Sequence, residues 1–89
     1  MSEPNLDQYR KQIAEIDDEI IELLVKRFEL TDSIGVFKKK RKMDIENKEV
    51  ENKLLARLIV ASNGKLDPDL VLNIYSEILK ESKKRQKEI

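Results

Sequence analysis

The stretch LDQYRKQIAEIDDEIIELLVKRFELTDSIGVFKKKRK, residues 6–42, decides the fold of this chain of 89 residues. Its apolar residues recur at intervals of three and four, the spacing that lines one buried face of an α-helix. The row comprises Leu6, Tyr9, Ile13, Ile16, Ile20, Leu23, Leu30, Ile34 and Phe37. Only Gly35 interrupts the helical pattern, so we expect one helix over about residues 5–40, capped by Asn5 or Ser2 and roughly 50 Å long.

Two shorter helices are expected after a loop at about residues 41–46. Asn47 can cap a helix over about 47–63, and Asp67 followed by Pro68 is a strong start signal for a helix over about 67–88. Their inward rows are expected to be Val50, Leu54, Leu58 and Ala61 in the first, and Val71, Ile74, Tyr75, Ile78 and Leu79 in the second. The sequence therefore predicts an all-α fold of three helices in a single domain, residues 1–89.

The composition excludes several classes of function. Eighteen basic residues balance eighteen acidic ones, so no global positive charge favours nucleic acid or an anionic membrane. Cysteine and histidine are absent, which excludes disulfides, thiolate chemistry and the usual zinc sites. No apolar run approaches the roughly 20 residues that span a bilayer, and residues 1–4 lack a signal-peptide pattern. We expect a soluble, cytoplasmic protein.

The length of the first helix predicts a second copy of the chain. The two later helices together contain fewer residues than the first and cannot cover both of its ends. Two first helices lying side by side, antiparallel or nearly so, would bury the apolar row along its whole length. A homodimer is therefore expected.

Polar residues interrupt the apolar faces of all three helices. Arg27 stands in the row of the first helix, Glu51 beside that of the second, and Ser82 and Gln86 continue that of the third. Each one alone is most often a surface residue or part of an ion pair. Lys38 lies eleven residues after Arg27, three helical turns, so the two cations project from nearly the same face about 16 Å apart at their backbones.

Arg10 precedes Arg27 by seventeen residues, roughly 25 Å along the same helix. It cannot reach a small ligand held by Arg27 of its own chain, but it could reach the site of an antiparallel partner. Several cations around one pocket favour a small dicarboxylate, because guanidinium groups bind carboxylates bidentately. Such a site can bind, orient and stabilise developing negative charge.

The ordered set of these residues resembles the all-helical class of chorismate mutases over nearly the whole chain, from Leu6 to Gln86. The matching positions are Arg10, Asp17, Arg27, the run Gly35-Val36-Phe37-Lys38, Glu51, Ser82 and Gln86. The resemblance implies an intertwined homodimer with two active sites, each completed by the first helix of the other subunit. It also implies the Claisen rearrangement of chorismate to prephenate, towards phenylalanine and tyrosine, which requires no cofactor, metal or covalent intermediate.

The resemblance also implies a role for each matching side chain. Arg27 would bind one substrate carboxylate and Arg10 of the other chain the second. Lys38 would bind a carboxylate and the ether oxygen, and Gln86 would share that oxygen. Glu51 would accept from the ring hydroxyl. Asn47 and Ser82 would line the site.

Two positions depart from the family pattern. Bacterial relatives often carry Arg at the position of Val50 and a carboxylate at the position of Asn47. The two changes are consistent with each other, because a charged pair has become a neutral one. Lys48 is a poor replacement for the missing cation, since it lies about 200° around the helix from position 50.

Two alternatives remain open from the sequence. A lyase that removes pyruvate from isochorismate would use a similar cationic pocket. A helical dimer that serves as an interaction or regulatory module, with Val50 marking the loss of a former site, would need no activity.

Overall fold

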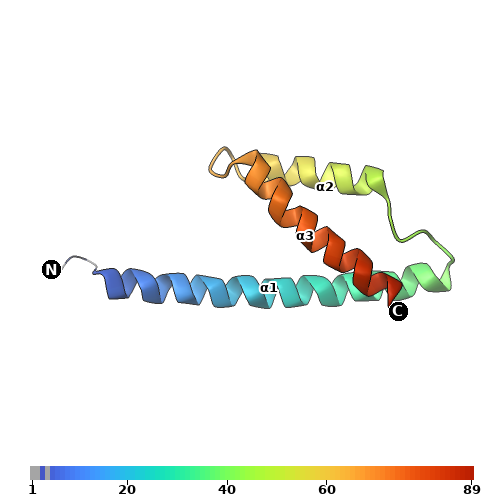
Figure 1. Cartoon of the computed structure of the whole chain (residues 1–89), viewed down its shortest axis with the longest axis horizontal. Coiled ribbons are helices and arrows are strands. Elements are labelled where there is room, and N and C mark those ends of the chain that lie inside the picture. Colours follow the sequence, from blue (N-terminus) through green and yellow to red (C-terminus); the bar gives the residue numbers. More distant parts are fainter. Residues whose placement is uncertain (1–2, 4) are drawn as a thin grey trace. The chain divides into compact units, whose positions relative to one another are not determined.

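Three α-helices make up the fold, and the computed structural model describes residue 3 and residues 5–89. In chain order they are α1 (Leu6–Lys40), α2 (Lys48–Ala61) and α3 (Pro68–Lys87) (Figure 1). No strand occurs in the described part of the chain. The expected all-α fold, with one very long N-terminal helix and two shorter ones, is confirmed.

Side-chain caps explain where the helices begin. The Asn5 side chain accepts a hydrogen bond from the backbone N–H of Gln8 at 2.9 Å, and the Gln8 side chain accepts one from the Asn5 N–H at 2.9 Å. This reciprocal pair is a capping box at the start of α1. Ser2, the other cap considered, lies outside the described residues. Asn47 caps α2 and Asp67 caps α3, where Pro68 occupies the first turn.

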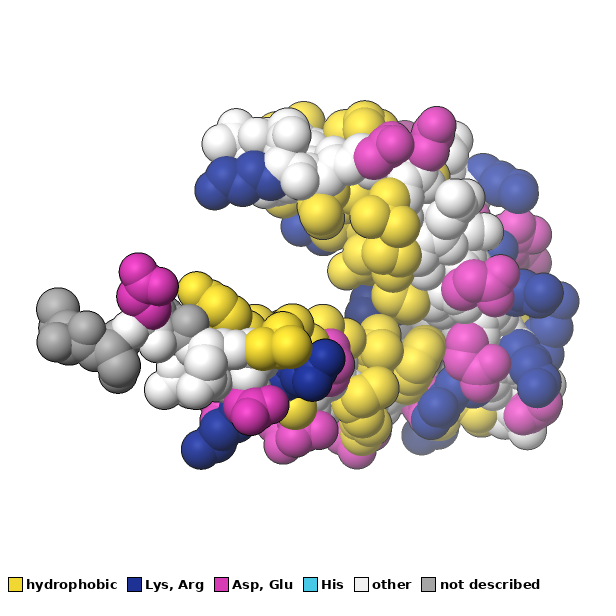
Figure 2. Space-filling model, turned by 60° about the vertical axis from the view of Figure 1, so that its left-hand side comes forward, with side chains coloured by type: hydrophobic (Ala, Val, Ile, Leu, Met, Phe, Trp, Pro, Cys, Tyr) yellow, Lys and Arg dark blue, Asp and Glu magenta, His cyan; other side chains and the backbone are white. Residues whose placement is uncertain are grey.

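The chain divides into two compact units, residues 1–30 and Thr31–Ile89, so that α1 contributes to both. In the first unit the apolar row of α1 is open to solvent: Ile16 is 54% exposed and Leu30 is 67% exposed. Figure 2 shows hydrophobic side chains at the surface of the face in view. A row with the spacing of a buried face is thus exposed in the first unit.

The second unit contains the end of α1 together with α2 and α3. Val71 and Ser82 on α3 are buried, as is Gly35 on α1. The inward rows contribute half-buried side chains, namely Leu54, Leu58, Tyr75, Ile78 and Leu79.

Three members of the expected inward rows are exposed in this unit: Val50, Ala61 and Ile74. The prediction of their burial was wrong for the single chain. Val50 stands in the first turn of α2 and Ala61 is its last residue, and a helix end packs against fewer neighbours than a helix centre.

The ends of α1 and α2 use the left-handed backbone conformation. Lys42 has φ 54°, and Asn63 and Gly64 in the turn before α3 have φ 52° and 71°. Such residues turn the chain away from a helix end. Among the described residues, no helix is both long enough and apolar enough to cross a membrane.

Candidate active site

Lys38 differs from the other cations at the end of α1. Its side chain is half-buried, whereas those of Lys39 and Lys40 are exposed. The Lys38 Nζ donates a hydrogen bond of 2.9 Å to the backbone carbonyl of Ile45, in the loop before α2. An ammonium group has three N–H donors, so Lys38 can hold this loop and still bind a ligand oxygen.

Gln86 carries a buried polar atom that the chain does not satisfy. Its Oε1 is buried, and no donor among the described residues bonds to it. Buried side-chain oxygens rarely lack a partner, so this one marks a place where a ligand or water supplies the missing bond. Rotation of the amide group would present its NH₂ donors instead, so Gln86 can also serve an acceptor on a ligand.

Gly35 lets α3 approach the end of α1 at this point. A Cβ atom at position 35 would lie 2.8 Å from Cγ of Gln86 and 2.9 Å from Cδ1 of Ile89. Distances below 3.0 Å are clashes, so only glycine allows Gln86 its present place. A pocket of about 340 Å³ opens here, with Gly35, Ile45 and Gln86 in its lining. Because Lys38 binds the Ile45 carbonyl, the pocket lies at the loop that Lys38 holds.

Ser82 lies one turn before Gln86 on α3 and is 4% exposed. Its hydroxyl donates to the Ile78 carbonyl at 3.0 Å, a bond within the helix. The hydroxyl proton is therefore directed at the Ile78 carbonyl, so towards a ligand the Ser82 oxygen would act as an acceptor. Asn47 is also engaged, because its side-chain oxygen accepts from the Val50 N–H at 3.2 Å.

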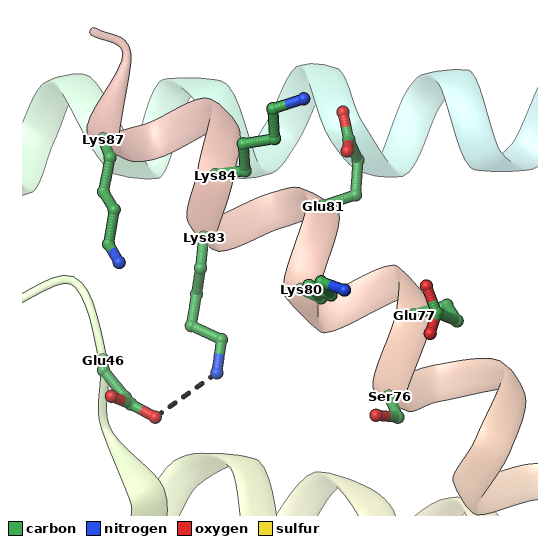
Figure 3. A pocket seen from close by; sticks show the side chains of 8 residues that line it. All are labelled: Glu46, Ser76, Glu77, Lys80, Glu81, Lys83, Lys84 and Lys87. Carbon is green, nitrogen blue, oxygen red and sulfur yellow. Dashed lines mark hydrogen bonds and ion pairs between the residues drawn. The ribbon is translucent and has the colours of Figure 1, made fainter.

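Glu51 forms an ion pair that the sequence analysis missed. The Lys83 Nζ lies 3.1 Å from Glu51 Oε1. It also lies 3.3 Å from Glu46 Oε1 (Figure 3). Glu46 also pairs with Lys48 at 3.0 Å. A hydrogen bond to Glu51 raises the pKa of Lys83, and bonds from Lys48 and Lys83 lower the pKa of Glu46. Lys83 directly follows Ser82 and precedes Gln86 by three residues, and this position is the signal that could have identified it.

A second missed pair ties α3 to the end of α1. Arg85 donates two hydrogen bonds to Asp32, of 3.0 Å from Nε and 2.7 Å from Nη2. The hydrogen bond from Arg85 lowers the pKa of Asp32, and the same bond raises the pKa of Arg85. Because Arg85 is adjacent to Gln86, this pair fixes the part of α3 that carries the unsatisfied amide.

The predicted site residues are therefore divided between the two units. Lys38, Asn47, Glu51, Ser82 and Gln86 belong to Thr31–Ile89, whereas Arg10 and Arg27 belong to the first 30 residues. Arg10 is exposed and Arg27 is half-buried. Their separation of seventeen residues in one helix corresponds to roughly 25 Å. No group of three or more acidic side chains placed to hold a metal ion occurs in the described part of the chain.

Comparison with known proteins gives one match. The family model for chorismate mutase type II matches residues 9–87, which covers nearly the whole chain and all seven predicted site residues. No significant match was found among curated proteins or among solved structures. The chain belongs to the type II chorismate mutase family, the enzymes that convert chorismate into prephenate.

Proposed function

We propose that this chain is a chorismate mutase whose active site combines Lys38, Glu51 and Gln86 with Arg27 and with Arg10 of the partner subunit. The family match supports the reaction. The observation that supports the site best is the unsatisfied buried oxygen of Gln86, a residue that also lines the pocket beside the loop that Lys38 holds. Residues 1–89 would act as one domain, completed by a second copy, and a cytoplasmic location remains a prediction.

The reaction is an intramolecular rearrangement in which the ether C–O bond breaks as a new C–C bond forms. No proton is transferred and no group leaves the molecule. Negative charge gathers on the ether oxygen in the transition state, so donors aimed at that oxygen lower the barrier. Lys38 and the NH₂ group of Gln86 supply these donors, and the ammonium group contributes the larger share because it is charged.

The remaining side chains hold the substrate in its reactive conformation. Arg27 and the partner subunit's Arg10 each bind one carboxylate, and Glu51 accepts a hydrogen bond from the ring hydroxyl. Asn47 and Ser82 line the site. Bringing the two reacting ends of one molecule together removes much of the entropy cost of the rearrangement.

The homodimer in this proposal is supported by the exposed apolar row of the first unit. Ile13, Ile16 and Ile20 are each about half exposed in the single chain, although their spacing is that of a buried face. A second copy laid along the row would cover it. An antiparallel arrangement also brings Arg10 of one chain towards Arg27 of the other.

An assay of chorismate consumption by ultraviolet absorbance, with identification of the product, tests the reaction. We expect prephenate without added metal, and a loss of kcat/KM of about 10²–10³-fold in Arg27→Ala and in Lys38→Ala. The exposed neighbours provide the controls Lys26→Ala and Lys40→Ala, which should retain activity. Pyruvate released from isochorismate in place of prephenate would assign the chain to the lyase reaction. Absence of any thermal shift with chorismate would favour the non-enzymatic module.

Mixed dimers test the exchange of Arg10. A dimer of one Arg10→Ala chain and one Arg27→Ala chain has one site with both arginines if Arg10 acts on the partner's site. It has none if Arg10 acts within its own chain. Random pairing of the two inactive variants should restore about a quarter of the wild-type activity, because half of the dimers are mixed and each has one intact site. No recovery in mixed dimers of confirmed composition would refute the exchange.

A further inference from the structure

Lys83 joins three segments of the second unit through its ammonium group. It extends from α3 to Glu46, in the loop before α2, and to Glu51, in the first turn of α2. Figure 3 shows its side chain reaching from the α3 ribbon to Glu46. The ion pairs to the two carboxylates are 3.3 Å and 3.1 Å long. One cation thus holds the loop and the start of α2 against α3.

Burial distinguishes the Lys83–Glu51 pair from the other ion pairs of this network. The side chains of Lys83 and Glu51 are 28% and 18% exposed, whereas those of Lys48 and Glu46 are 77% and 48% exposed. Exposed ion pairs contribute little to stability because water and salt screen their charges, and a less exposed pair is screened less. The hydrogen bond to Glu51 is the largest of the interactions that raise the pKa of Lys83.

Glu51 needs such a partner to act on a ligand. A glutamate side chain has three rotatable bonds, and holding it in one conformation costs rotamer entropy. An ammonium group beside one carboxylate oxygen fixes the carboxylate, while its remaining lone pairs can accept further hydrogen bonds. Lys83 also lies between Ser82 and Gln86 in sequence, so one segment of α3 carries all three residues.

We propose that Lys83 is a positioning residue that fixes the Glu51 carboxylate for the ring hydroxyl of the substrate, with Glu46 as its second anchor. This inference rests on the proposed mutase function and on the role of Glu51 in it. Position 50 of α2 is Val, and Lys48 pairs with Glu46. The cation that would hold Glu51 next to the ring hydroxyl therefore comes from α3.

The role predicts a specific kinetic signature. The ring hydroxyl is not part of the bonds that break or form, so Glu51 binds it equally well in the ground state and in the transition state. Loss of such uniform binding raises KM and leaves kcat unchanged. Loss of Lys38, by contrast, lowers kcat, because that side chain meets charge that develops only in the transition state.

The experiment compares KM and kcat for chorismate in Lys83→Met, Lys83→Arg and Lys84→Met. Lys83→Met should raise KM about tenfold, the value of one charge-assisted hydrogen bond, with kcat within about twofold of wild type. Lys83→Arg keeps the charge, so its KM should lie within about threefold of the wild-type value. Lys84→Met alters the exposed neighbour and should behave as wild type.

A double-mutant cycle with Glu51→Gln separates positioning from a general structural effect. If Lys83 acts through Glu51, Lys83→Met should change KM by less than about twofold in the Glu51→Gln background. The inference is overturned by an unchanged KM in Lys83→Met, or by the same tenfold increase in both backgrounds. Circular dichroism verifies that each variant is helical, and Lys83→Gln, which keeps most of the side-chain stem, replaces Lys83→Met if the latter does not fold.

Different results would contradict the mutase function and the role of Lys83. A wild-type protein that makes no prephenate contradicts the proposed function itself. A wild-type protein that makes prephenate, with a Lys83→Met variant of equal KM, contradicts the role of Lys83 alone.

Discussion

The first 30 residues and Thr31–Ile89 carry similar helical patterns but bury them to different extents. In the first unit Ile16 and Leu30 are 54% and 67% exposed, although they stand in a row typical of a buried face. In the second unit Val71 and Ser82 are 5% and 4% exposed. Ion pairs there join residues that are far apart in sequence, such as Asp32 and Arg85. The second unit therefore finds partners among its own residues, whereas the row of the first unit is exposed.

The largest effect is expected from a charge placed in the row of the first unit. Ile16→Asp would hardly change stability if Ile16 faced water, because most surface substitutions change stability by less than about 0.5 kcal/mol. Buried between two copies of α1, the same carboxylate would lack a partner, so we expect dissociation to monomers and loss of chorismate turnover. Light scattering after size exclusion measures the mass, and the ultraviolet assay measures turnover.

Val25→Asp is the matched control for this substitution. Val25 is 51% exposed on the same helix and lies nine residues from Ile16, about 180° around the axis. It should remain dimeric and active. Equal masses and activities for the two variants would show that the row does not form the dimer contact.

An intermediate effect is expected from the two glycines of the second unit. Ala at position 35 gains about 1 kcal/mol of helix propensity, which offsets part of the cost of tight packing. Its Cβ would nevertheless stand 2.8 Å from Gln86 Cγ, so the Gln86 side chain must move. We expect kcat/KM to fall about ten- to a hundredfold, with a thermal midpoint close to that of wild type.

Gly64→Ala should show the opposite behaviour. No atom lies within 4 Å of a Cβ at this position, but its φ of 71° is unfavourable for Ala. We expect about 1 kcal/mol of lost stability and unchanged kcat/KM. Thermal unfolding and the chorismate assay on both variants test the contrast. A Gly35→Ala variant with full activity would show that the position of Gln86 is unimportant.

The sequence was sufficient to predict the helices because their signals are local. The three- and four-residue spacing, the Asn47 cap and the Asp67–Pro68 start each act over a few residues, and all are present in the structure. Exposure was harder to predict, as Val50 and Ile74 show, because it depends on what lies opposite each residue.

The site was predictable only in part. Periodicity identifies residues that interrupt apolar faces, such as Ser82 and Gln86, and the structure places these two one turn apart on α3. It does not identify which long charged side chains meet across helices. The sequence analysis did not single out Lys83 or Arg85, yet each pairs with a carboxylate at least 30 residues away in sequence. The shared role of Arg10 and Arg27 stays a prediction.

The smallest effect is expected from the charges that distinguish the second unit. The hydrogen bond from Arg85 holds the pKa of Asp32 below its ordinary value of 3.8. A carboxyl group whose folded pKa is lower than its unfolded pKa stabilises the fold at pH values above the unfolded pKa, and this contribution is lost as pH falls through the folded pKa. Asp32→Asn should therefore lower the thermal midpoint at pH 7 by a few degrees, and the difference from wild type should shrink below about pH 4.

The change in thermal midpoint on removing a carboxylate should depend on the unit in which that carboxylate lies. Asp18→Asn changes an exposed carboxylate of the first unit and should leave the midpoint unchanged at both pH values. Added salt should reduce the effect of Asp32→Asn, since water and ions reach this pair. A difference from wild type that does not shrink as pH falls below about 4 would mean that Asp32 stabilises the second unit by packing, because the contribution of the ion pair fades as the carboxylate is protonated.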